Sequence, residues 1–443
     1  MTPMKATQVK LSDFSSPPMR AFHLSWVAFF VCFFGWFGIA PLTPLVRDEF
    51  HLSKAQLGNI MIASVAITVL ARLFIGVLCD RFGPRRVYSG LLALGALPVA
   101  GIGLSHGYAS FLVARLLIGA IGASFVVTQY HTSAMFASRV VGTANATAAG
   151  WGNLGGGVAQ MVMPMIVAGF LALGLTTAQS WRLAMVVPAL LMVALSIVYL
   201  KFTQDGPDGN RGASQEEPRT TLRPGKTGTF LAAARDPRVW ALAVIYGACF
   251  GVELTIHNVA ALYFRDRFHL SLGAAGFVAG LFGALALFAR ALGGIFGDRA
   301  GRRFGLRGRA SFLGSMVLAE GVFLTLFSRM GSLPLAIASM VVFGLFVHMA
   351  AGATYSVVPF LNRRAVGSVA GIVGAGGNIG AVLAGFLFRG GMATERGFLW
   401  LGVAVLAAAG SSLLLRFDAS EEVENEPLLS LDRGADKGLS PAE

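Results

Sequence analysis

Long apolar segments dominate the chain, and short polar stretches separate them. A helix needs about 20 consecutive apolar residues to cross the hydrocarbon core of a bilayer. Such segments can be marked off at residues 22–45, 57–79, 87–105, 109–131, 142–171, 181–200, 238–263, 272–297, 310–328, 333–356, 366–388 and 397–416. The pattern predicts an all-α membrane protein with 12 transmembrane helices. The first segment is too long for a cleaved signal peptide, so we expect it to remain as a span.

Composition agrees with this pattern, because 55% of the residues are hydrophobic and only 13% are charged. Soluble domains average about 25% charged residues. Lys and Arg concentrate in the loops that follow even-numbered spans, which predicts that these loops and both termini are cytoplasmic. The net charge of +13 follows from this bias, so we expect no nucleic-acid partner. We expect a multi-pass protein of the cell (inner) membrane, a monomer in the lipid bilayer.

Polar segments divide the chain into five parts. We predict an N-terminal tail at residues 1–21, a first six-helix bundle at 22–200 and a second at 238–416. Between the bundles lies a linker rich in Gly and Pro at 201–237, and an acidic tail follows at 417–443. Such compositions favour flexible or disordered segments.

The two predicted bundles repeat each other in sequence. "RDEFHLS", which begins at Arg47, returns as "RDRFHLS" at Arg265. The same offset carries Arg72 onto Arg290, and it carries Asp80 onto Asp298. Three matches at one spacing indicate an internal duplication, as found in transporters built from structural repeats.

Two arginines of this repeat, Arg72 and Arg290, lie inside predicted spans. An arginine in mid-bilayer costs about 2.5 to 3.5 kcal/mol even on lenient scales, so it must face a cavity or a counter-ion. Neither has a carboxylate one turn away on its own helix. Pseudo-symmetry would place the two charges opposite each other at one depth, where an anion between them would relieve their repulsion. A guanidinium presents forked donors, which suit a planar oxyanion.

A second group of residues forms a stripe on the seventh span. Tyr246, Phe250, Glu253 and His257 are spaced by four, three and four residues, which places them on one helical face. An aromatic stripe is typical of packing, but a buried acid needs water, a proton or a partner. Glu253 is therefore our leading candidate for a proton carrier. The alternative is that it serves as a permanent counter-ion for Arg290 or Arg115.

Motifs in both halves resemble those of a known transporter family. "GVLCDRFGPRR" and "GGIFGDRAGRR" look like the major facilitator superfamily loop, which makes Asp80, Arg81, Asp298 and Arg299 candidate gating or structural residues. "AAGWGNLGGG" and "GAGGNIG" resemble the paired signatures of the nitrate/nitrite porter family, closest to its high-affinity nitrate transporter branch. The resemblance covers roughly residues 20 to 416.

This resemblance implies a substrate site and roles for its residues. It places Phe125, Tyr246 and Phe250 around the anion, with Arg72 and Arg290, and it gives Asn153 a donor role. Asn378 would either donate to the anion or pair with the backbone. Position 257 more often carries Asp in the family, so His257 is a departure and its proton role is an open alternative. Glycines beside the two asparagines should let their helices pack closely.

Other polar residues carry weaker predictions. Arg115 resembles a superfamily arginine tied to structure and proton coupling, and we favour a structural role. Glu320 and His348 could pair with each other or with local partners. The three cysteines have no metal-ligand spacing, so we expect neither a disulfide nor a cofactor.

The absence of GxSxG, Walker and HExxH motifs from the sequence argues against an enzyme. Three classes of membrane protein fit the sequence: a secondary transporter, a channel and a receptor. The duplicated bundles favour a transporter that works by alternating access. The resemblance implies import of nitrate, with nitrite as a weaker substrate. Proton symport is our hypothesis for coupling; nitrate/nitrite antiport is the alternative, and transport of another small anion is less favoured.

Overall fold

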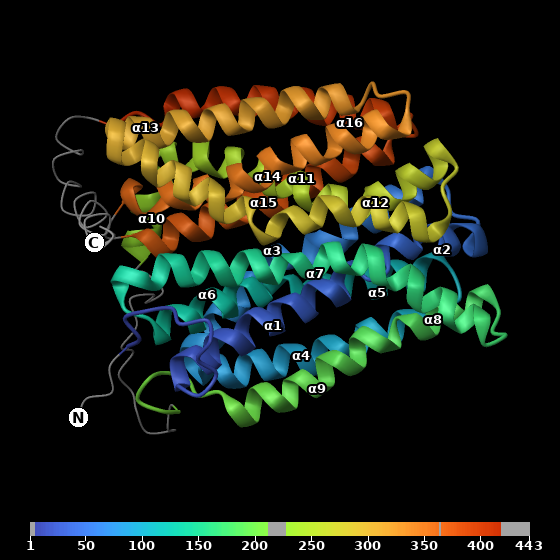
Figure 1. The fold of residues 1–443 in the computed structure, drawn as a ribbon, viewed down its shortest axis with the longest axis horizontal. Helices are drawn as coiled ribbons and strands as arrows, with labels where there is room; N and C mark the ends of the chain where they lie inside the picture. The colour runs from blue at the N-terminus through green and yellow to red at the C-terminus, as the bar shows by residue number, and fades with distance from the viewer. Residues whose placement is uncertain (1–4, 211–226, 363–364, 418–443) are drawn as a thin grey trace, which may run out of the picture.

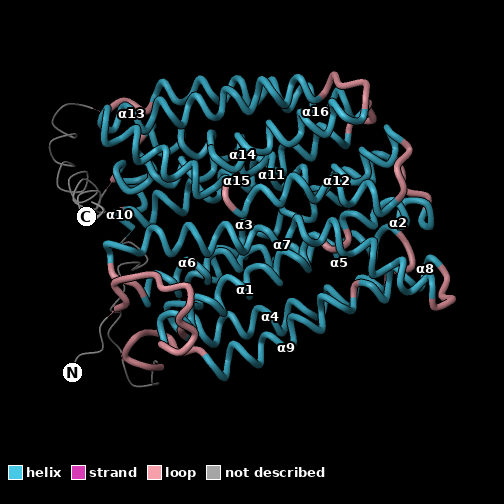
Figure 2. Tube along the Cα trace, viewed as in Figure 1, coloured by secondary structure: helices cyan, strands magenta, loops and turns pink. Residues whose placement is uncertain are grey.

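The computed structural model describes residues 5–210, 227–362 and 365–417. These residues are almost entirely helical, and Figure 2 shows the loops gathered at the two ends of the helices. The helices are α1 (Pro17–Phe37), α2 (Thr43–Phe50), α3 (Lys54–Phe82), α4 (Pro84–Gly101), α5 (Tyr108–Ile118), α6 (Ser124–Met135), α7 (Ser138–Ala172), α8 (Thr177–Ala184), α9 (Val186–Phe202), α10 (Thr227–Arg235), α11 (Pro237–Phe268), α12 (Leu272–Ala284), α13 (Ala289–Phe327), α14 (Leu333–Leu361), α15 (Val366–Arg389) and α16 (Thr394–Ala409).

The described residues contain 11 helical segments that are long and apolar enough to cross a membrane. The longest, Leu272–Phe327, has 56 residues, which is far more than one crossing requires. Gly305 interrupts it with a φ of 68° and a ψ of −162°. Arg309 then reaches back to Asp298, so the chain reverses direction here. This segment therefore supplies two crossings, which makes the 12 that the sequence predicts.

The crossings form two bundles that lie side by side (Figure 1). Helices α1 to α9 make one half, and α11 to α16 make the other. The most apolar stretches of Pro17–Phe50 and Pro237–Phe268 are each 83% buried, whereas those of the other spans are 39% to 56% buried. The first and seventh crossings are therefore the central helices of their halves, as their matching places in the duplication require.

Two pairs of helices join the halves, α7 with α12 and α3 with α15 (Figure 1). A Cβ added to Gly157 would lie 2.7 Å from the carbonyl carbon of Gly283. One added to Gly58 would lie 2.5 Å from the Cα of Arg389. Both distances are too short for carbon atoms, so glycine is required for these helices to approach so closely. This agrees with the close packing expected from the glycine-rich signature in α7.

Several crossings are broken near the middle. A 3₁₀ segment, η3 (Gly119–Ala123), separates α5 from α6, and another, η4 (Leu285–Leu287), separates α12 from α13. The sequence predicted single spans here, because hydropathy measures apolar length and is insensitive to short breaks. Phe125 and Arg290 each occupy the second position of the helix that follows such a break. Broken helices of this kind commonly line transporter sites.

The segments outside the crossings are described only in part. Within the predicted linker the structure has α10, and residues 211–226 lie outside the described residues. Nearly all of the predicted acidic tail, residues 418–443, also lies outside them. Arg238, at the start of α11, donates to the carbonyl oxygen of Arg416 at 3.2 Å. The described chain therefore ends beside the start of α11, at the same end of the bundle as the start of α1 (Figure 1).

Candidate functional site

Arg72 lies on α3 and is half-buried. Its Nη1 donates to the carbonyl oxygen of Gly374 on α15, in the opposite half, at 3.2 Å. The guanidinium carbon lies 5.4 Å from the ring centre of Phe125 and 5.5 Å from that of Phe250. Within the described residues, its Nε and Nη2 are buried without a hydrogen-bond partner. Two donors of a fixed fork are thus available to a ligand.

Arg290 lies in the first turn of α13 and is buried. Its guanidinium carbon is 5.8 Å from the ring centre of Phe250. The guanidinium carbon of Arg72 lies 5.5 Å from the centre of the same ring, so both guanidinium groups contact Phe250. The structure thus brings both arginines to the ring of Phe250.

Arg290 differs from Arg72 in having a carboxylate partner. Its Nη2 donates to Oε2 of Glu253 on α11 at 2.5 Å, and the exposed fractions of the two side chains are 4% and 0%. A counter-ion role for Glu253 beside Arg290 was one of the alternatives left open by the sequence. The partner lies on a different helix, and spacing along one helix cannot reveal it. Of the roles left open for Glu253, its contact is that of a counter-ion to Arg290.

Aromatic rings form one wall of the site. Tyr246 and Phe250 stack with ring centres 5.2 Å apart and planes 9° apart. Tyr355 on α14 meets Tyr246 edge to face at 5.3 Å and Phe125 at 6.3 Å. Tyr355 was not predicted as a site residue, because it belongs to no repeat, motif or stripe that singles it out.

A cluster of buried titratable residues lies behind Arg290. His348 on α14 places Nδ1 at 3.6 Å from Oε2 of Glu253, and its Nε2 lies 3.2 Å from the carbonyl oxygen of Phe282. Both carboxylate oxygens of Glu320 are buried without a hydrogen-bond partner in the described part of the chain. A pair between Glu320 and His348, one of two alternatives, is not seen there; His348 has local partners instead.

His257 shares its helix with Glu253 but lies in a different environment. Its ring centre is 4.8 Å from that of Phe37, and a Cβ added to Gly156 would lie 3.2 Å from its Cε1. Both ring nitrogens are buried without a partner among the described residues. His257 thus packs at the junction of the two halves.

Arg115 lies on α5 and is 1% exposed. Its Nη1 donates to the carbonyl oxygen of Trp36 at 2.5 Å, and its Nη2 donates to Oδ1 of Asn258 at 2.7 Å. Asn258 belongs to α11 in the other half, so Arg115 joins the halves. This contact fits the structural role that we favoured.

The two asparagines of the glycine-rich signatures are buried, with exposed fractions of 1% for Asn153 and 0% for Asn378. Neither atom of the Asn153 amide has a hydrogen-bond partner within the described residues. Asn378 donates to the carbonyl oxygen of Gly374, which also accepts from Arg72. Backbone pairing, one of the two roles expected for Asn378, is therefore present, and its Oδ1 has no hydrogen-bond partner in that part of the chain.

The charged loop residues lie away from this group. Asp80 accepts from the hydroxyl of Tyr130 at 2.9 Å, and Asp298 accepts from Arg309. Arg81 stacks over Phe82 at 5.2 Å, and Arg299 stacks over Phe296 at 5.6 Å. The two aspartates therefore tie neighbouring helices together near the α10 end of the bundle.

The arrangement offers two guanidinium groups with unpaired donors and a wall of aromatic rings. Charged donors that converge in a low-dielectric site bind anions strongly. The described residues hold no group of three or more His, Cys, Asp or Glu side chains suited to a metal ion. The chemistry is thus that of anion recognition.

Comparisons with known proteins agree with the fold. The family model of the Major Facilitator Superfamily matches residues 25–385. High affinity nitrate transporter 2.5 of Arabidopsis thaliana is 42% identical over 420 residues, which cover 93% of this chain and 82% of that protein. Nitrate/nitrite transporter NrtP of Nostoc punctiforme is 28% identical over 447 residues, with 84% of this chain and 87% of that protein covered.

A solved structure shows the same fold. It is a bacterial homolog of the human lysosomal transporter Spinster, in an inward-facing and unoccupied conformation. It superposes with a TM-score of 0.71 at 16% identity, over 93% of this chain and 99% of that chain. This chain therefore belongs to the Major Facilitator Superfamily of transporters, in the nitrate/nitrite porter family with the high-affinity nitrate transporters.

Proposed function

We propose that this chain imports nitrate across the cytoplasmic membrane, with nitrite as a weaker substrate, by alternating access of one central site. The observation that carries the proposal is the gathering of Arg72 and Arg290 around the ring of Phe250. A flat anion on this aromatic wall can accept from both guanidinium forks. The names of the relatives, which refer to nitrate and nitrite transport, support this choice of substrate.

The size and shape of the donors favour a small planar anion. Arg72 keeps Nε and Nη2 for a ligand, whereas its Nη1 is engaged by Gly374. Two donors side by side on a planar group suit two oxygens of one flat oxyanion. Phosphate is tetrahedral and more highly charged, so it fits an aromatic wall less well.

Coupling to protons is part of the proposal. Glu253 accepts from Arg290 at 2.5 Å, whereas Arg72 forms no ion pair with a carboxylate within the described residues. A proton on Glu253 would weaken that ion pair and release Arg290 to the anion. The anion and the deprotonated carboxylate of Glu253 would thus compete for one guanidinium. Nitrate alone would enter against an inside-negative potential at about 2.3 kcal/mol per charge per 100 mV, so a coupled proton also removes this cost.

The substrate proposal is tested by uptake of labelled nitrate into proteoliposomes that contain the purified chain. Nitrite, phosphate and a small organic anion are added as competitors at equal concentrations. We expect saturable nitrate uptake that nitrite inhibits weakly and that phosphate leaves nearly unchanged. Stronger competition by phosphate or the organic anion than by unlabelled nitrate would refute the choice of substrate.

The proposed topology follows the charge bias of the loops. The α10 end would face the cytoplasm, with the linker and both termini, and the α2 end would face outward. We propose that the chain works as a monomer, since each half already supplies one arginine of the site.

A further inference from the structure

The repeated heptapeptide forms the same local structure in both halves. Helix α2 ends at Phe50, and His51 follows with a φ of 49°; α11 ends at Phe268, and His269 follows with a φ of 54°. The next helix of each half then begins after a serine cap. Left-handed residues other than glycine are uncommon, so their recurrence at matching positions shows that the duplication preserved a turn.

The Arg-Asp pair of each copy lies on the last turn before this bend, at the α2 end of the bundle. Nη1 of Arg47 lies 2.5 Å from Oδ2 of Asp266, and Nη2 of Arg265 lies 4.0 Å from Oδ2 of Asp48. Each arginine thus has the aspartate of the other copy within ion-pair distance, and Nε of Arg47 also pairs with Asp48 of its own copy at 3.0 Å. This exchange is what a two-fold relation between the halves produces.

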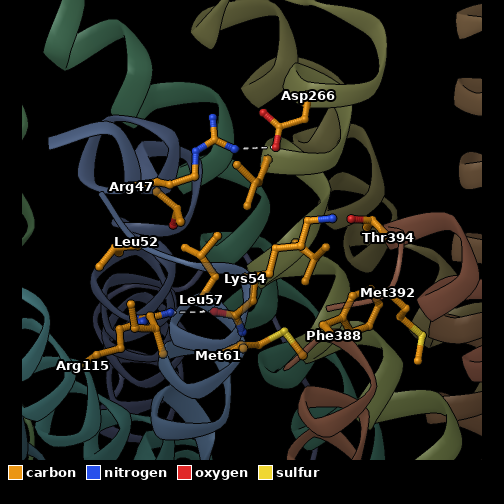
Figure 3. A pocket seen from close by; sticks show the side chains of 16 residues that line it. Arg47, Leu52, Lys54, Leu57, Met61, Arg115, Asp266, Phe388, Met392 and Thr394 are labelled. Carbon is orange, nitrogen blue, oxygen red and sulfur yellow. Dashed lines mark hydrogen bonds and ion pairs between the residues drawn. The ribbon is translucent and has the colours of Figure 1, made fainter. Parts of the chain in front are cut away.

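These contacts cross from one half to the other directly above a cavity of about 260 Å³. Figure 3 shows Arg47 and Asp266 meeting at one side of the cavity, with Leu57 and Arg115 farther in. The deeper bond from Arg115 to Asn258 also crosses between the halves. The outer end of the interface is therefore held by two layers of polar contacts with a cavity between them.

We propose that Arg47, Asp48, Arg265 and Asp266 form a reciprocal latch that holds the outward end of the transporter closed. The latch must open for the site to be reached from outside, because both of its pairs join the halves. This inference rests on the alternating access proposed above, but it does not depend on which anion is carried.

The strength of the latch follows from its exposure. The four side chains have exposed fractions of 26% to 55%. Each ion pair of this exposure shifts the equilibrium between the open and closed latch by up to about fivefold, and salt weakens the pair by screening. Two pairs therefore favour closure by up to about 25-fold, which is enough to set the resting state while still allowing the latch to open.

The latch is tested with spin labels on the outer ends of the halves. Ala55 on α3 and Ala274 on α12 are both exposed, and the variants Ala55→Cys and Ala274→Cys carry the labels. The three native cysteines are buried and are replaced by serine or alanine if they label. Distances are measured by pulsed electron resonance on the full chain in nanodiscs, without substrate.

With the native latch we expect one short distance population. The double variant Asp48→Asn and Asp266→Asn should increase a longer population several-fold. The fourfold swap R47D, D48R, R265D and D266R rebuilds both pairs with reversed polarity and should restore the short population. Glu49→Gln is the matched control, since Glu49 pairs with Arg182 inside one half at 2.6 Å, and it should leave the distances unchanged.

An unchanged distribution in the Asp48→Asn and Asp266→Asn variant would overturn the latch, as would failure of the folded fourfold swap to restore the short population. If the nitrate proposal fails, phosphate or the organic anion will compete better than unlabelled nitrate in the uptake assay. The spin-label distances would still change with the latch variants. The two proposals therefore fail separately.

Discussion

Replacing Arg72 with lysine keeps a positive charge in the site but removes the guanidinium fork. Two donors of Arg72, Nε and Nη2, have no partner among the described residues, and its guanidinium lies over Phe125 and Phe250 at 5.4 and 5.5 Å. A lysine ammonium keeps one strong bond to an anion but cannot supply the second donor in the same plane. We therefore expect Arg72→Lys to fold and to bind the anion much more weakly.

The size of this effect can be worked out from the lost contacts. One hydrogen bond to a charged group contributes about 1.5 to 3 kcal/mol, and stacking of a cation on an aromatic ring adds about 0.5 to 1 kcal/mol. Together these give about 2 to 4 kcal/mol, and each 1.4 kcal/mol is a factor of ten. The apparent affinity for nitrate should therefore fall by about 30-fold to several hundred-fold.

The assay is nitrate uptake by proteoliposomes over a range of nitrate concentrations, with the amount of folded protein measured in each preparation. Arg303→Lys is the matched control, because Arg303 is exposed and stacks on Phe304 at 5.2 Å outside the site. Arg290→Lys should also reduce uptake sharply. Near-normal uptake by both the Arg72→Lys and the Arg290→Lys variants would refute a bidentate role for these arginines.

Two further predictions concern packing and the aromatic wall. Gly157→Ala should reduce nitrate uptake severalfold, because the added methyl would lie 2.7 Å from the carbonyl carbon of Gly283. Gly169→Ala is the control and should transport normally, because a Cβ at Gly169 on the same helix would have no atom within 4 Å. Equal uptake by the two alanine variants would contradict the close approach of α7 and α12. Tyr355→Leu should raise the KM for nitrate about two- to tenfold, since it removes aromatic contacts worth about 0.5 to 1.5 kcal/mol. Tyr355→Phe keeps the ring and should raise the KM less. An unchanged KM in Tyr355→Leu would exclude Tyr355 from the site.

Much of the architecture could be predicted from sequence because it depends on patterns along a single helix. The twelve spans follow from hydropathy, and the meeting of Arg72 with Arg290 follows from the duplication. The breaks at η3 and η4 were not predicted, because short 3₁₀ segments stay as apolar as the helices around them.

The partners of individual side chains were harder to predict, because they come from distant parts of the chain. Arg290 and Glu253 are 37 residues apart in sequence, and no helical periodicity connects α11 to α13. Tyr355 is the single tyrosine of α14, and only the packing of α14 against α11 brings it to Tyr246. The reciprocal pairing of the two Arg-Asp copies needs the two-fold arrangement of the halves, which the repeat itself implied.

Proton coupling through Glu253 is tested most directly by nitrate uptake into liposomes that contain no internal anion substrate. Uptake is compared with and without an inward proton gradient, for the wild type and for Glu253→Gln. Symport predicts that the gradient drives accumulation in the wild type. In Glu253→Gln the neutral amide leaves Arg290 free at every pH, so the gradient should have little effect. Uptake that ignores the proton gradient and occurs only with internal nitrite would contradict symport and identify an exchanger, with Glu253 a fixed counter-ion of Arg290.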